Sequence, residues 1–311
     1  MSPRSTAPEP RQVGPRRTPL RAIAYKLASA LVLACMFALI KSLGGRYPIG
    51  EIVFARSAFA LLPIIAVLHA RRQWSTLRTS RPLAHLRRSV AGVASLFLSF
   101  AAVSLLPLST ATALTYSAPL FITLLSVVLL GEQVSPGRWA AVLAGFAGML
   151  MVIQPDLQAG LPLGKVFGVM AAVATAVALV AIRQMAASES ALAIAFYFTI
   201  FGTVVGAATL PLQVVVPDAP DAVRLVCVGI LGGTAQLLLT MAYRLAPASV
   251  LAPYEYATLV GAIIIGFVAW GEMPGPLEWF GITVIVGTNV AMTVHERSQA
   301  RRDPRSGEAP R

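Results

Sequence analysis

The chain has 311 residues, of which 57% are hydrophobic and only 12% are charged. A soluble domain carries about twice that share of charged residues, and the apolar residues here gather in blocks of about twenty, enough to cross about 30 Å of hydrocarbon. This composition excludes an ordinary soluble protein and predicts a polytopic membrane protein.

The net charge of +12 lies mostly in the two ends of the chain and in one connecting segment. Basic residues there suit the anionic surface of a membrane, so no nucleic-acid partner is expected. Cys35 and Cys227 both lie in apolar blocks, and no Cys/His spacing is typical of a zinc site. We therefore expect no disulfide framework, no metal and no cofactor.

Ten apolar blocks follow residues 1–21, a stretch rich in Pro, Arg and Ser that is expected to be disordered. Because lipid cannot satisfy unpaired backbone groups, and because the blocks lack the alternation of a barrel strand, each block is predicted to be a helix. The predicted helices span residues 22–42, 49–70, 86–106, 109–131, 138–154, 162–184, 190–211, 221–243, 248–271 and 276–295. Residues 296–311 are polar and are also expected to be disordered. The predicted fold class is therefore all-α, with ten transmembrane helices.

The distribution of Lys and Arg predicts the orientation in the membrane. With the N-terminus inside, the two ends and the inner loops collect twenty basic residues, Arg88 among them, and one more, Arg56, lies within the second predicted helix. The outer loops receive only Lys41, Arg46, Lys165 and Arg224. Since basic residues are enriched on the cytoplasmic side, both termini are expected in the cytoplasm and the protein in the cell inner membrane.

The sequence repeats itself at a shift of 140 residues, and about a quarter of positions 92–139 are identical to their partners. Apolar bias inflates matches of Leu and Ala, but it does not explain Gly-Glu, Pro and Trp in register. The matched pairs include Pro107 with Pro247, Ser109 with Ser249, Tyr116 with Tyr256, Glu132 with Glu272, and Trp139 with Trp279. One repeat covers five helices, an odd number, so the second copy must lie upside down, as in many secondary transporters. The predicted repeats are residues 22–154 and 162–295.

Three segments carry a resemblance to a known family: IGEIVFARSAFALL, LPLSTATALTYSAPLFITLLSVVLLGE and LAPASVLAPYEYATLVGAIIIGFVAWGE. They resemble the drug/metabolite transporter superfamily, EamA type, and the resemblance covers residues 22–295. The paired Gly-Glu ends are its most specific signal. The resemblance implies ten helices, two five-helix repeats, a central cavity and transport of a small metabolite or drug-like solute, often export. The second copy departs from the common pattern, because Leu259 stands where that pattern has a proline, as Pro119 does in the first copy.

Glu255 is the strongest single candidate for a functional residue. It lies about seven residues into the predicted helix 248–271, hence about 10 Å deep. A carboxyl at that depth is costly and indicates function by default, for example proton coupling or recognition of a cationic group. The alternative is a neutral carboxyl held by Tyr, Thr or backbone groups for packing alone. At the membrane edge, Glu132 and Glu272 are expected to be solvated helix ends.

Arg56 lies about 10 Å from the outer end of the second predicted helix. It is either functional or a structural arginine that caps carbonyls of a neighbouring helix. The depth of Arg56 is measured from the outer face of the membrane and that of Glu255 from the cytoplasmic face. No direct contact between them is therefore expected.

Thr112, Thr115 and Tyr116 share one face of the fourth predicted helix, and the repeat shift matches Thr115 and Tyr116 with Glu255 and Tyr256. Equivalent faces meet near the pseudo-two-fold axis, where such transporters bind substrate. Because hydroxyl groups also form hydrogen bonds between membrane helices, two roles stay open for these residues: lining a cavity and packing helices together. The expected substrate-binding or coupling residues are Glu255, Tyr256, Tyr116, Thr115, Thr112, Arg56, Tyr254 and Gln236.

An intramembrane enzyme acting on a lipid or isoprenoid substrate is the alternative from another class. Such an enzyme needs clustered ionisable residues at one depth. Asp156, Asp218 and Asp221 instead lie in predicted outer loops, which favours a carrier. The expected partners are a small-molecule substrate and membrane lipids, and a homodimer is left open.

Overall fold

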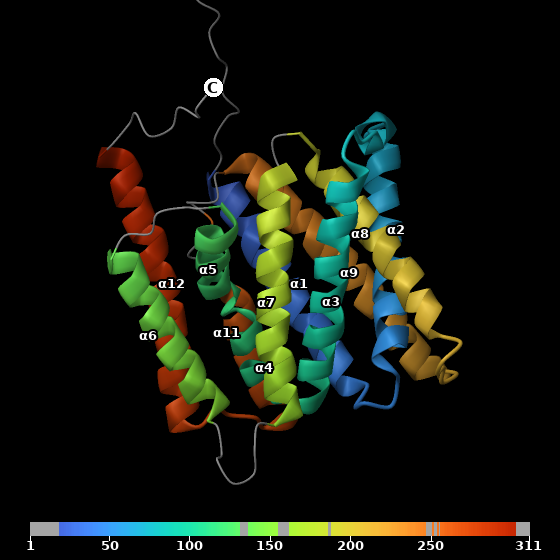
Figure 1. Cartoon of the computed structure of the whole chain (residues 1–311). Helices are drawn as coiled ribbons and strands as arrows, with labels where there is room; N and C mark the ends of the chain where they lie inside the picture. Colours follow the sequence, from blue (N-terminus) through green and yellow to red (C-terminus); the bar gives the residue numbers. More distant parts are fainter. Residues whose placement is uncertain are drawn as a thin grey trace, which may run out of the picture.

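A computed structural model shows helices packed side by side in one bundle (Figure 1). The structure describes residues 19–130, 136–154, 162–185, 188–246, 251, 254 and 256–302, in which all regular structure is helical. With the labels of Figure 1, the helices are α1 (Pro19–Ser42), α2 (Ile49–Ala70), η1 (Trp74–Leu77), α3 (Pro82–Leu105), α4 (Leu108–Thr115), α5 (Ala118–Leu130), α6 (Pro136–Ile153), α7 (Leu163–Met185), α8 (Ala191–Thr209), α9 (Ala219–Leu245), α11 (Ala257–Trp270) and α12 (Pro276–Arg302).

Seven helical segments within this part of the chain are long and apolar enough to cross a membrane. Two shorter apolar helices, Trp139–Ile153 and Ala257–Trp270, accompany them. The chain is therefore a multi-pass membrane protein, as its composition predicts.

Several helix ends differ from the sequence-based prediction. α1 begins at Pro19 and α3 at Pro82, earlier than expected, because proline suits a first helical position where the missing N–H would have no partner. α12 continues to Arg302, whereas the predicted helix ends at residue 295. The Gln, Ala and Arg residues that follow residue 295 are good helix formers, and the next proline is Pro304.

The fourth predicted helix is broken into α4 and α5. The backbone N–H groups of Ser117 and Leu120 bond to carbonyls three residues earlier, at 3.1 and 3.0 Å. Pro119 has no N–H to bond to Thr115, and it disfavours helical geometry at the residue before it. Tyr116 therefore lies at a break between helices rather than on the face of a continuous one.

The helices pack in a small number of pairs. α3 contacts α7, α1 contacts α9 and α11, α2 contacts both α8 and α9, and α6 contacts α12. α4 contacts α11 and, with α5, also α7. The largest core cluster lies where α1, α2, α3 and α4 meet, and its fully buried side chains include Met36, Ile40, Ile52, Phe100 and Leu114.

Glycines let α2 lie very close to its neighbours. A Cβ added to Gly206 on α8 would lie 2.6 Å from the Cα atom of Phe54, and one added to Gly202 would lie 2.6 Å from Ser57 Oγ. On α9, a Cβ at Gly233 would lie 2.7 Å from the carbonyl oxygen of Ala60. These glycines thus serve close helix packing.

We expect Gly206→Ala to lower stability by about 1–2 kcal/mol, because overpacking against backbone atoms outweighs the better helix propensity of alanine. The matched control is Gly287→Ala in α12, where an added Cβ meets nothing within 4 Å. That change should be neutral or stabilising by up to about 1 kcal/mol. Thermal unfolding of the purified protein in detergent measures both, and equal effects would contradict the packing argument.

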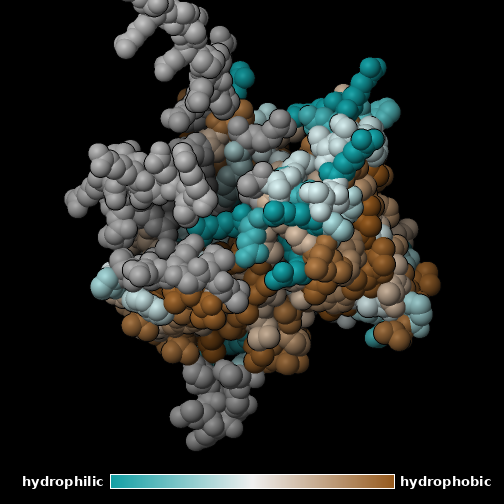
Figure 2. Space-filling view, turned by 45° about the horizontal axis from the view of Figure 1, so that its top comes forward, coloured by the Kyte–Doolittle hydropathy of each residue, from teal (hydrophilic) through white to brown (hydrophobic). Residues whose placement is uncertain are grey.

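Charged residues are distributed unequally over the two ends of the bundle. Figure 2 shows hydrophilic side chains at the end where α1 begins and a hydrophobic flank below it. We call this the basic end, and its exposed arginines include Arg71, Arg72, Arg78, Arg81 and Arg87. The opposite end carries Lys41, Arg46, Lys165 and Arg224.

Candidate functional site

Tyr116 and Tyr256, which the repeat shift makes equivalent, lie against each other. Their ring centroids are 6.2 Å apart and the rings are tilted by 52°. Tyr116 directly follows α4, and Tyr256 directly precedes α11. The fold therefore brings together two expected site residues that are 140 positions apart, each at a helix end.

The threonines beside them bond within their own helix. Thr112 Oγ1 donates to the carbonyl oxygen of Leu108 at 2.7 Å, and Thr115 Oγ1 donates to that of Ala111 at 3.0 Å. Thr112 is only 1% exposed, so its hydroxyl serves the packing of α4. Thr115 is partly exposed, and its oxygen keeps the capacity to accept a hydrogen bond.

The remaining expected residues are placed as follows. Tyr254 and Gln236 are partly buried, and the backbone carbonyl of Gln236 accepts a hydrogen bond from Thr240 at 2.8 Å. Glu255 and Glu132 lie outside the described residues.

Arg56 is buried in the helix bundle together with a second arginine, Arg88 of α3. Each is only 6% exposed. Both guanidinium groups approach the ring of Phe198 on α8, with the Cζ atom of Arg88 at 3.9 Å and that of Arg56 at 5.4 Å from the ring centroid. Sequence reasoning missed Arg88 because it placed the start of this helix at residue 86. A start at Pro82 puts Arg88 about 9 Å inside the helix.

A salt bridge joins α1 to the segment after α11 at the opposite end. Lys41 Nζ lies 2.7 Å from Glu272 Oε1 and donates to the carbonyl oxygen of Leu106 at 2.7 Å. Glu272 Oε2 accepts from the backbone N–H of Leu108, the first residue of α4, at 3.0 Å. The side chains of Lys41 and Glu272 are 13% and 21% exposed, so Glu272 is not the solvated helix end that the sequence suggested.

Asp221 forms a second ionic cluster at this end. It is fully buried in the first turn of α9 rather than in a loop as expected. Its carboxylate contacts Arg46 at 3.0 Å and Arg224, and accepts from the Tyr47 hydroxyl at 2.9 Å. Burial and the hydrogen bond to Asp221 raise the pKa of Tyr47, which keeps its hydroxyl a donor.

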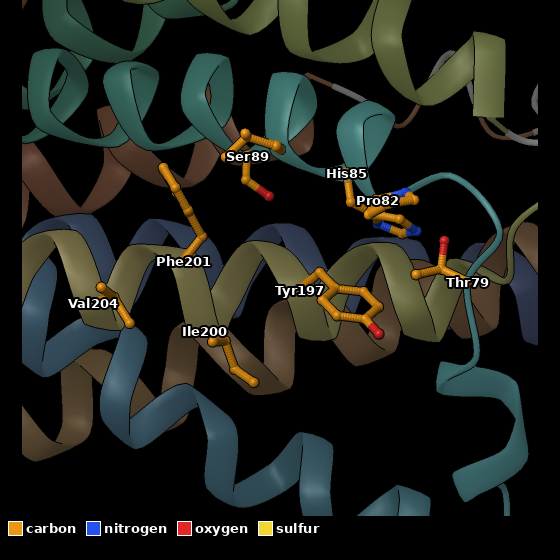
Figure 3. Close-up of a pocket in the computed structure, with 9 residues that line it drawn as sticks. Thr79, Pro82, His85, Ser89, Tyr197, Ile200, Phe201 and Val204 are labelled. Carbon is orange, nitrogen blue, oxygen red and sulfur yellow. The ribbon is translucent and has the colours of Figure 1, made fainter.

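A cavity of about 250 Å³ lies between α3 and α8, near the basic end (Figure 3). Its lining is mostly apolar, and its polar residues are Thr79, His85, Ser89 and Tyr197. His85 Nε2 lies 3.1 Å from Glu189 Oε2, and Thr79 donates to Glu189 at 2.9 Å. These hydrogen bonds, that of His85 first, hold the pKa of Glu189 below its ordinary value.

Comparison with known proteins adds independent findings. Residues 20–154 and 162–293 each match the EamA-like transporter family. The pseudopaline exporter CntI of Pseudomonas aeruginosa is 30% identical over 266 residues, 85% of this chain and 93% of that protein. The S-adenosylmethionine uptake transporter of Rickettsia conorii is 27% identical over 292 residues, 92% of this chain and 97% of that protein.

A riboflavin transporter of Rhizobium johnstonii is 26% identical over 257 residues, 82% of this chain and 84% of that protein. Among solved structures, a crystal structure with 23% sequence identity aligns with a TM-score of 0.63. The alignment covers 89% of this chain and 98% of that one, so the two share a fold.

Proposed function

The chain belongs to the EamA-like transporter family, and on that premise we propose that it exports a small metabolite or drug-like solute across the cell inner membrane by alternating access. The named relatives are transporters of small molecules and not enzymes, so a carrier is confirmed over the intramembrane-enzyme alternative. The relatives include both exporters and uptake systems. Export is our proposal because the relative at 30% identity is an exporter.

We also propose that helices α1 to α6 and α7 to α12 are inverted repeats. Exchanging equivalent helices turns the α3–α7 contact into the α9–α1 contact, and the α1–α11 contact into the α7–α5 contact. The contacts of α2 with α8 and of α6 with α12 map onto themselves. Such reciprocal pairing supports a pseudo-two-fold axis that passes between these self-matched pairs.

The single observation that carries the proposed transport site is the meeting of Tyr116 and Tyr256. They are equivalent residues at the 140-residue shift, and each lies at a helix end. Interrupted helices at such an axis are where secondary transporters bind their substrates. We propose that Thr115, Tyr254, Gln236 and the Glu255 carboxyl complete this site and that Glu255 exchanges a proton during transport.

For orientation, we propose that the basic end faces the cytoplasm. The four basic residues of the opposite end are all engaged: Lys41 with Glu272, Arg46 and Arg224 with Asp221, and Lys165 with the carbonyl oxygen of Ile153 at 2.5 Å. The arginines of the basic end that are exposed can instead meet anionic lipid, in line with the positive-inside rule.

Reporter fusions check this orientation. A fusion after residue 160 should give a periplasmic signal, and a fusion after residue 311 should give a cytoplasmic one. The reverse pair of signals would refute the ten-helix arrangement with both termini inside.

The proposed function is tested by solute flux. The purified protein is reconstituted in vesicles, and flux is measured with and without a pH gradient for a panel that includes S-adenosylmethionine and riboflavin. We expect saturable flux of at least one small solute above that of protein-free vesicles, and a response to the pH gradient. Flux that equals the protein-free background across a broad metabolite panel would contradict the proposal.

A further inference from the structure

We propose that Arg56 of α2 and Arg88 of α3 form a binding site for a carboxylate group of the transported solute. Both residues are buried inside the bundle. This inference rests on the proposed function and deepens it, because it assigns the substrate to the organic acids and zwitterions. It adds Arg88 and Phe198 to the candidate binding residues and gives Arg56 a specific role.

The first argument is that both guanidinium groups are buried without acceptors. The Nε and Nη1 atoms of Arg56 and of Arg88 are inaccessible to solvent and have no hydrogen-bond partner among the described residues. Buried donors in proteins are normally paired, and a buried charge without a counter-charge is strongly unfavourable. Two such groups in one place therefore indicate a function that outweighs their cost.

The second argument is that the acidic side chains of the described residues interact with groups other than these two arginines. These are Glu51, Glu189, Asp218, Asp221, Glu272 and Glu278, and each accepts a hydrogen bond from another residue. None of the ion pairs between described residues includes Arg56 or Arg88. Among the described residues the pair thus has no counter-charge, and its positive charge is available to a bound anion.

The surroundings favour an organic anion. Both Cζ atoms lie within 5.4 Å of one point, the centroid of the Phe198 ring, so one small molecule can reach both. Glycines hold the guanidinium groups close to the helix backbones: a Cβ at Gly92 would lie 2.9 Å from Arg88 Nη1, and one at Gly232 would lie 3.1 Å from Arg56 Nε. Arginine donors match the planar carboxylate, while the ring of Phe198 suits the hydrocarbon part of an organic acid.

The burial of these nitrogen atoms also indicates in which state of the transport cycle the anion binds. Because the Nε and Nη1 atoms have almost no accessible surface in this conformation, neighbouring helices must separate before an anion reaches them. Separation of packed helices is what alternating access requires. The site is therefore occluded here and opens in another state of the transport cycle.

The test uses the full-length protein purified in detergent and two probes of the same shape, glutarate and its neutral diamide glutaramide. Binding is measured by isothermal titration and by the midpoint of thermal unfolding, at constant ionic strength set with sodium chloride. We expect glutarate, but not glutaramide, to bind and to raise the midpoint. In Arg56→Gln and Arg88→Gln, the Kd for glutarate should rise about 10- to 100-fold, the effect of one lost charge-assisted hydrogen bond.

The matched control is Arg87→Gln, which removes an exposed arginine from the same helix and should leave glutarate binding unchanged. Without ligand, Arg56→Gln and Arg88→Gln should keep or raise the unfolding midpoint, since each removes a buried, unpaired charge. If a glutamine variant fails to purify, Arg88→Lys keeps the charge but loses the planar donor set, and should still weaken glutarate binding.

Three outcomes would overturn the proposal: equal binding of glutarate and glutaramide, unchanged glutarate binding in both glutamine variants, or inorganic phosphate binding as tightly as glutarate. A lowered midpoint in ligand-free Arg56→Gln and Arg88→Gln would likewise overturn it, since it would show two structural cations paired within the protein. Flux without carboxylate binding would refute this inference alone, whereas carboxylate binding without flux of any solute would refute the proposed function alone.

Discussion

Lys41→Met is expected to destabilise the folded protein by roughly 3 kcal/mol, because it leaves the largely buried carboxylate of Glu272 without its cation. The loss is large because one salt bridge joins three segments: the end of α1, the start of α4 and the residues after α11. Lys41 also lies 5.6 Å from the ring centroid of Trp270, a cation–π contact that methionine cannot make. Thermal or denaturant unfolding in detergent measures the effect.

The double variant Lys41→Met/Glu272→Gln provides the sharper comparison. The glutamine oxygen can still accept from the N–H of Leu108, and no unpaired charge remains, so the double variant should be more stable than Lys41→Met alone. We expect the two changes to be non-additive by about 1–3 kcal/mol. Additive effects would mean that the 2.7 Å contact contributes nothing as a pair. Arg72→Met, at an exposed position of the basic end, is the control and should change stability by no more than about 0.5 kcal/mol.

Glu255→Gln is expected to lower transport by roughly tenfold or more, because the amide keeps the shape of the side chain but cannot carry a proton or a negative charge. Folding and membrane insertion should be intact. The pH dependence of transport should flatten between about pH 5 and 8 if the carboxyl exchanges a proton during the cycle. The measurement is flux in vesicles at a series of pH values.

Tyr116→Phe probes the other wall of the same site. It removes one hydroxyl and should weaken substrate affinity by about 1 kcal/mol, seen as a higher KM at unchanged protein stability. If Glu255→Gln transports like the parent across that pH range, the carboxyl is structural and the assignment of the site is wrong.

Much of the fold was predictable because hydrocarbon imposes a simple rule on sequence. A helix is the only local way to satisfy the backbone in lipid, so apolar blocks near twenty residues mark most spans. The 140-residue shift makes Tyr116 and Tyr256 equivalent, and their rings lie against each other in the fold. This equivalence depends only on register and needs no knowledge of packing.

The less predictable features depend on tertiary contacts. Pro119 interrupts a segment whose apolar pattern reads as continuous, and α3 begins at a proline that looked like part of a loop. That shift of four residues places Arg88 deeper inside the helix than predicted. The partners of Glu272 and Asp221 come from distant helices, which local sequence does not reveal.

The most direct test of the central claim, a site that opens alternately to both sides, is the accessibility of residue 115. Thr115→Cys is made in a background with Cys35 and Cys227 replaced by serine, and it is labelled with a membrane-impermeant maleimide in right-side-out and in inside-out vesicles. Controls are Ser75→Cys at the basic end and Leu212→Cys at the opposite end, both exposed, which should each label from one side only. The account predicts that Cys at position 115 is labelled from both sides, and labelling from only one side would contradict it.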